Sequence, residues 1–153
     1  MHLAGGIAYT VGLGRMTNDQ APMTNGLSMA TPRPNGDFDL AERTARFGEE
    51  VIRFCRGIRR NAIASPLISQ LVRSGTSIGS NYCEADEAGS RKEFKYRISV
   101  CCRESRETKF QLRMIVAAAA DKAEPARSLW KEADELNRIF AAIRRKTDDD
   151  DET

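Results

Sequence analysis

Apolar residues recur at three- and four-residue steps along four segments of the chain, which is the spacing of amphipathic helices. The four predicted helices run from residue 38 to 60, from 65 to a stop at Gly89, from 91 to 120, and from 125 to 146. The links between them are only about four to six residues long, so consecutive helices must fold back on each other. We therefore expect an all-α protein, an antiparallel up-down four-helix bundle.

Residues with capping chemistry stand at the starts of these segments. Asp37 is expected to cap the first helix, and Ser65-Pro66 combines a capping hydroxyl with a proline at the first helical position. Ser90 and Glu93 have the spacing of a capping box, in which each side chain bonds the backbone amide of the other residue. These signals place three helix starts independently of the apolar pattern.

The two ends of the chain lack a sustained apolar period. Residues 1–36 are dominated by glycine, threonine, proline and asparagine, and residues 148–153 contain five acids and no base. We expect both to be disordered tails on either side of a bundle domain at residues 37–147. Methionines at positions 16, 23 and 29 leave open a translation start within the first segment.

A strip of basic residues follows one side of the third predicted helix. At about 100° per residue, seven cations fall within an arc of about 120°. They are Arg91, Lys92, Lys95, Arg103, Arg106, Lys109 and Arg113. Such a row matches the closely spaced charges of a nucleic-acid backbone. The alternative is an ordinary solvated face with local ion pairs, such as Arg103 with Glu107.

The charges are unevenly distributed along the chain, so the net charge of +2 understates how basic the predicted bundle is. Residues 1–36 hold two bases and one acid, while the last six residues hold five acids, so the predicted bundle is clearly basic. A basic domain permits contact with nucleic acid and does not require it.

Enzymatic chemistry has little support in this chain. The only histidine is His2, and the predicted helices contain no Glu-x-x-His motif and no glycine-rich loop after a strand. Cysteines occur at positions 55, 83, 101 and 102 without Cys-x-x-Cys spacing, which favours free thiols that pack as small apolar groups in a reducing compartment. We expect no catalytic residue, metal site or cofactor.

Membrane insertion is also not expected. The longest uninterrupted apolar run has six residues, from Ile115 to Ala120, against roughly 18 for a membrane helix. The first residues do not combine a basic region with a long apolar segment, as a secretory signal would. The sequence therefore predicts a cytoplasmic protein.

A row of polar residues on the second predicted helix, Arg73, Ser77, Asn81 and Glu84, repeats at three- and four-residue steps. The row is either a shared surface between subunits or a face exposed to solvent. Small residues beside it, at positions 75, 76 and 79, would let another helix approach closely, within the bundle or between subunits.

The sequence around this row resembles a known family. The stretches that carry the resemblance are Ser69–Ala85, Ser90–Phe94 and Glu104–Thr108. They resemble the four helix bundle proteins, also called 23S rRNA-intervening sequence proteins, which are similar to the accessory variability protein of diversity-generating retroelements. The family often reads Asn-Ile-x-Glu-Gly where this chain has Asn-Tyr-Cys-Glu-Ala.

The resemblance implies a four-helix protomer in a homo-oligomer, typically a five-fold ring, with no established catalytic activity. It also implies a basic surface, through which the retroelement relatives contact nucleic acid and a reverse transcriptase. Two functions therefore follow from the sequence. One is an accessory protein that binds RNA or DNA, beside a reverse transcriptase or another protein partner. The alternative is a protein-interaction or structural bundle with no nucleic-acid role.

Overall fold

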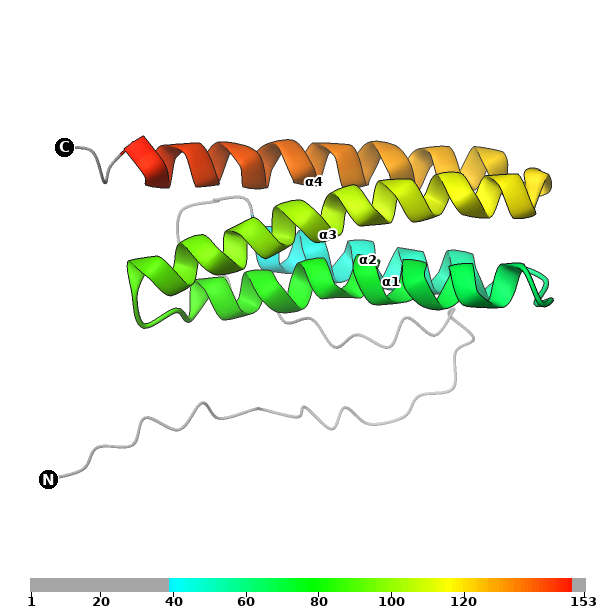
Figure 1. Ribbon diagram of the computed structural model, residues 1–153, viewed down its shortest axis with the longest axis horizontal. Coiled ribbons are helices and arrows are strands. Elements are labelled where there is room, and N and C mark those ends of the chain that lie inside the picture. The colour runs from blue at the N-terminus through cyan, green and yellow to red at the C-terminus, as the bar shows by residue number, and fades with distance from the viewer. Residues whose placement is uncertain (1–38, 150–153) are drawn as a thin grey trace, which may run out of the picture.

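The computed structural model describes residues 39–149, which form four α-helices and contain no strand (Figure 1). The helices are α1 (Leu40–Arg56), α2 (Ala64–Asp86), α3 (Arg91–Ala118) and α4 (Ala123–Asp149), with a 3-10 turn, η1 (Ala120–Lys122), before α4. The all-α prediction is therefore confirmed. Residues 1–38 and 150–153 lie outside the described residues, and with them the expected N-terminal tail and the expected cap Asp37.

Consecutive helices run in opposite directions and lie side by side (Figure 1). Contact is most extensive between α2 and α3 and between α3 and α4, and α1 packs more closely on α2 than on α4. In this up-down arrangement α1 lies diagonally opposite α3. The start of α3 lies beside the end of α4, which decides the surroundings of the basic strip.

The helix starts follow local capping chemistry, with two differences from the prediction. Asp39 caps α1, and its side chain accepts a hydrogen bond from the backbone amide of Glu42 at 3.1 Å. Asn61 supplies its amide oxygen to the backbone amides of Ile63 and Ala64, so α2 begins one residue before Ser65. An asparagine two or three residues before a helix can replace an N-cap side chain in this way.

The cap on α3 is confirmed, because the hydroxyl of Ser90 accepts from the backbone amide of Glu93 at 3.2 Å. At the other end of the bundle, the last helix extends two residues past the boundary predicted at residue 147. Helix α4 continues to Asp149, and the carboxylate of Asp148 lies 2.7 Å from the Lys95 ammonium. This ion pair holds the first predicted tail residue against α3.

The core contains the predicted apolar stripes. The largest side chains that are fully buried include Phe47, Leu71, Ile98, Leu136 and Phe140, at least one from each helix. Two polar residues that interrupt the stripe of α3 are buried as well, and one of them, Thr108, bonds the hydroxyl of Ser74 at 3.0 Å. A hydroxyl pair of this kind satisfies both groups inside the core.

The small residues on α2 serve contact within the protomer. A Cβ atom added to Gly75 would lie 3.0 Å from both methyl groups of Val51, and one added to Gly79 would lie 3.4 Å from the hydroxyl of Thr44. Helix α1 therefore crosses α2 closely at Gly75, and a side chain at this position would require Val51 to move by a few tenths of an ångström.

All four cysteines are free, as expected, and only Cys83 is partly exposed. Burial raises the pKa of Cys55 to about 11 and that of Cys101 to about 12. These thiols are protonated at neutral pH and pack as small apolar groups.

Candidate nucleic-acid interface

The basic strip of α3 divides into two groups with different surroundings. The group that faces α4 consists of Arg91, Lys95 and Lys109. Arg91 donates to the backbone carbonyl of Thr147 at 2.9 Å, and the Lys109 ammonium lies 2.7 Å from the Asp134 carboxylate. Together with the pair formed by Lys95, these contacts tie α3 to α4.

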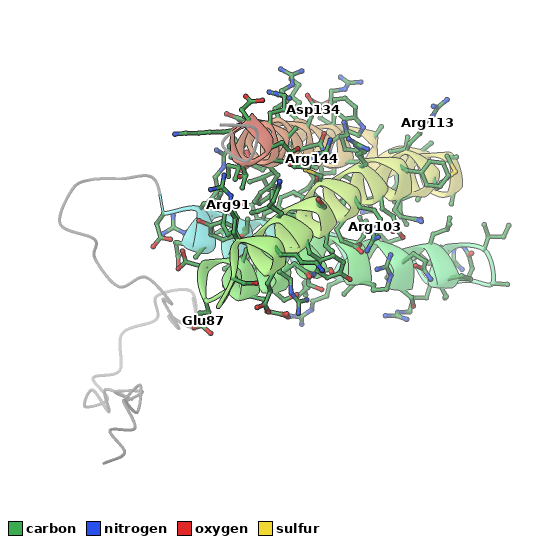
Figure 2. All side chains as sticks on the ribbon, turned by 60° about the vertical axis from the view of Figure 1, so that its left-hand side comes forward. Glu87, Arg91, Arg103, Arg113, Asp134 and Arg144 are labelled. Atoms are coloured by element: carbon green, nitrogen blue, oxygen red, sulfur yellow. The ribbon has the colours of Figure 1, made fainter. Side chains whose placement is uncertain are left out.

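The second group consists of Lys92, Arg103, Arg106 and Arg113, which are all exposed and form no ion pair with any of residues 39–149. Figure 2 shows Arg103 and Arg113 on separate turns of α3, away from the core. From Lys92 to Arg113 the group extends about 32 Å along the helix. We call the side of α3 that carries these four cations the outer face.

Two of the three acids of α3 lie on a different side and are bound by α2. Arg73 donates to the carboxylate of Glu104 at 3.1 Å and to that of Glu107. The hydrogen bond to Glu107 and the nearby charge of Glu104 raise the pKa of Arg73. The local pair of Arg103 with Glu107, which was the alternative explanation of the strip, does not form because Glu107 bonds Arg73 across the two helices.

The rest of the polar row on α2 also bonds within the protomer. The side-chain amide of Asn81 donates to the carbonyl of Ser77 at 2.9 Å, and its oxygen accepts from Arg97 of α3 at 3.3 Å. Glu84 lies 2.5 Å from the other end of the Arg97 guanidinium. With Arg73 and its two glutamates, these residues make an α2–α3 polar network.

Arg97 connects α3 to the polar residues of α2, a role that the sequence analysis did not predict. Arg97 was not singled out, because its partners Asn81 and Glu84 lie on the preceding helix and no local spacing reveals them. The final residue of the family-like motif, Ala85, is buried in the core, and α2 continues through it to Asp86. Alanine in place of the family's glycine therefore leaves the helix end intact.

Helix α4 adds cations that act on the middle of α3 and that the sequence analysis also missed. Burial raises the pKa of the Cys102 thiol, and the positive charges of Arg144, Arg106 and Arg145 oppose this increase. The two arginines of α4 are therefore close enough to act on the middle of α3 (Figure 2 labels Arg144). The run Arg144-Arg145-Lys146 was visible in the sequence, but only the antiparallel pairing of α3 and α4 gives it this place.

The carboxylate that binds Lys109 is strongly held in its charged form. Its hydrogen bond from Lys109, together with the nearby charge of Arg138, lowers the pKa of Asp134 below its usual value of 3.8. Asp134 therefore remains ionised at neutral pH and neutralises Lys109, which leaves Lys109 less available to an external anion.

The described residues lack two other kinds of site. Among residues 39–149, no group of three or more histidine, cysteine, aspartate or glutamate side chains is arranged to hold a metal ion. Within the same part of the chain, no helix is both long enough and apolar enough to cross a membrane.

Comparisons with known proteins address the fold and the family. A comparison with curated proteins found no match. Among solved structures, the chain is similar to a protein of unknown function from the S23 ribosomal protein family of Bacteroides thetaiotaomicron, with 23% sequence identity and a TM-score of 0.61. The similarity covers 68% of this chain and 96% of that one, and it supports the fold alone. Residues 36–142 match the model of the 23S rRNA-intervening sequence protein, and the chain belongs to this family.

Proposed function

We propose that the protein is a non-enzymatic accessory factor that binds nucleic acid through the outer face of α3. The observation that carries the proposal is the pairing pattern of α3. Two of its three acids, Glu104 and Glu107, and three of its seven strip cations bond other parts of the protomer, while four cations remain exposed without an acidic partner among residues 39–149.

Exposed cations without partners favour phosphate binding for a physical reason. A cation that already holds a carboxylate must lose that contact before it can bind a phosphate, whereas an unpaired cation exchanges only water and small ions. Each phosphate that is neutralised releases condensed counterions, which drives association at low salt. The outer face, about 32 Å long, is long enough to contact several phosphates of one strand.

We also propose that the protein is a homo-oligomer, with a pentamer favoured. This proposal rests on the family resemblance, because the polar row on α2 bonds within the protomer and gives no separate support. A ring would present the outer face once in each protomer, so several weak contacts to one nucleic acid would add through multivalency. Light scattering coupled to size exclusion should give about five times the protomer mass of 17.0 kDa, and a monomer would contradict the proposal.

The experiment for nucleic-acid binding uses fluorescence anisotropy with labelled RNA and DNA over a range of salt concentrations. The test variant is Arg103→Glu with Arg106→Glu. The matched control is Arg53→Glu with Arg56→Glu, which reverses two exposed arginines at the same spacing on α1, diagonally opposite α3. Both variants change the net charge equally, so a general charge effect would act on both.

We expect the wild-type protein and the α1 control to bind with a clear salt dependence, and the α3 variant to lose binding at moderate salt. Equal binding by the two variants would show that only net charge matters and would overturn the outer face as the site. No binding by the wild-type protein at low salt would instead support an interaction or structural bundle without a nucleic-acid role.

A further inference from the structure

Two aromatic side chains interrupt the cations of the outer face. Tyr96 is 59% exposed and Phe110 is 56% exposed, although aromatic residues of this size are usually buried or largely covered. They are 14 residues apart on α3, which corresponds to about 21 Å along the axis and about 40° around it. Both rings therefore lie on the same side of the helix as Arg103 and Arg106, which stand between them.

The ring of Tyr96 lies beside the α2–α3 polar network. The guanidinium carbon of Arg97 lies 5.6 Å from the centre of the ring. Arg97 is itself fixed by Asn81 and Glu84. A cation at this distance attracts the ring weakly, and most of the Tyr96 side chain stays open to solvent.

A third aromatic residue stands at the far end of the outer face. Trp130 of α4 is 41% exposed and, with Arg113 and Arg127, lines a hollow of about 260 Å³ between α3 and α4. The ammonium of Lys109 lies 5.0 Å from the centre of its ring. Trp130 is the only tryptophan in the chain, so its fluorescence reports on this end of the face.

We propose that the outer face takes single-stranded nucleic acid, with bases stacked on Tyr96 and Phe110 and phosphates bound by Arg103 and Arg106 between them. This inference rests on the proposed function and names the form of nucleic acid. Cations alternating with exposed aromatic rings are the arrangement that binds single strands, because every base has a face that can stack. In a duplex the base faces are already stacked on one another, so Tyr96 and Phe110 would gain little.

The separation of Tyr96 and Phe110 along the helix axis sets the length of strand between the two stacked bases. At about 3.4 Å per nucleotide in a stacked strand, about 21 Å corresponds to roughly six nucleotides. Stacking does not depend on the identity of the base, so we expect little sequence preference.

The experiment compares three labelled probes of equal phosphate number: a single strand, a strand of abasic sites, and a duplex. RNA and DNA versions of the single strand are both used. The wild-type protein should bind the base-bearing strand at least about tenfold more tightly than the abasic strand. Binding should also change the fluorescence of Trp130 for the single strand more than for the duplex.

The variant Tyr96→Ala with Phe110→Ala should lose this preference. We expect about 10- to 100-fold weaker binding of the base-bearing strand, unchanged binding of the abasic strand and an unchanged salt slope. The conservative variant Tyr96→Phe with Phe110→Tyr should bind like the wild-type protein. So should Ile52→Ala, which removes an apolar side chain that is 41% exposed on the opposite helix α1.

Equal binding of the base-bearing and abasic strands by the wild-type protein would overturn the stacking proposal while leaving phosphate binding intact. This result needs no variant, so it does not depend on how the alanine variant folds. Failure of all three probes to bind would overturn the proposed function itself. Preference for the duplex would show that the aromatic residues serve another purpose.

Discussion

The side of α3 that faces α2 and its outer face both carry charged side chains, but these charges have different partners. Toward α2, Glu104 and Glu107 are bound by Arg73, and the side chain of Glu104 is only 8% exposed. On the outer face, Arg103 and Arg106 are exposed and have no acidic partner among the described residues. One helix thus separates charges that hold the fold from charges that are available to a ligand.

The side toward α4 shows that residue type alone does not make this separation. Lys95 and Lys109 belong to the same basic strip as Arg103 and Arg106, but each has a carboxylate of α4 at 2.7 Å. A count of cations along the helix therefore overestimates the binding surface. The position of a cation relative to the neighbouring helices decides whether it is available.

The largest effect should come from removing Arg73. The variant Arg73→Ala leaves the buried carboxylate of Glu104 without its partner, and because Arg73 is itself half-exposed we expect the free energy of unfolding to fall by about 1 to 2 kcal/mol. Arg103→Ala on the outer face should change it by less than about 0.5 kcal/mol. Urea unfolding followed by circular dichroism measures both. Equal losses of unfolding free energy in the two variants would show that the charges on the two sides of α3 contribute equally to stability.

Acid should weaken the contact between α3 and α4. The pKa of Asp134 is lowered in the folded protein by Lys109, so its contribution to stability is complete above the unfolded pKa and is lost as pH falls through the folded pKa. We therefore expect the urea concentration at the unfolding midpoint of the wild-type protein to decrease when the pH is lowered below about 4. Asp134→Asn should lower this midpoint at pH 7, and the midpoint of the variant should decrease less below pH 4 than that of the wild-type protein. A variant with the wild-type acid response would contradict this role for Asp134.

The smallest effect concerns the cysteines on the buried sides of α3. Cys101 and Cys102 are buried, and burial raises the pKa of both thiols. Iodoacetamide at pH 8 should therefore modify the partly exposed Cys83 first, as followed by mass spectrometry. The other cysteines should react only after unfolding. Modification of Cys101 as fast as Cys83 would mean that the interface between α2 and α3 opens readily.

Local features of the fold could be predicted from the sequence because they depend on nearby residues. Apolar periodicity located four helices, and the Ser90 cap was correct because it involves residues three positions apart. The cap of α1 was placed on Asp37 although Asp39 caps the helix, since two aspartates so close together give the same signal. Helix α4 extends two residues past the predicted boundary, where Asp148 pairs with Lys95 of another helix, a contact that no local pattern indicates.

The candidate site was less predictable for the same reason. The strip was recognised from spacing within one helix, but its division into paired and unpaired cations depends on how α2 and α4 are rotated against α3. Arg73 and Glu104 are 31 residues apart, and nothing in their local sequence relates them. The exposed rings of Tyr96 and Phe110 became notable only when their surroundings were known.

The most direct test of the central claim compares two pairs of cations on the same helix. In Arg103→Gln with Arg106→Gln, two unpaired charges of the outer face are removed. In Lys95→Gln with Lys109→Gln, the same number of charges is removed from residues that already hold carboxylates. The measurement is the slope of the logarithm of the binding constant against the logarithm of salt concentration, for a single-stranded probe.

Each phosphate contact contributes about 0.7 to this slope for a single strand. We expect the arginine pair variant to lose about 1.4 from the magnitude of the slope, and the lysine pair variant to keep the wild-type slope. Equal losses in the two variants, or a larger loss in the lysine pair variant, would contradict the claim that only the unpaired cations of the outer face bind phosphate.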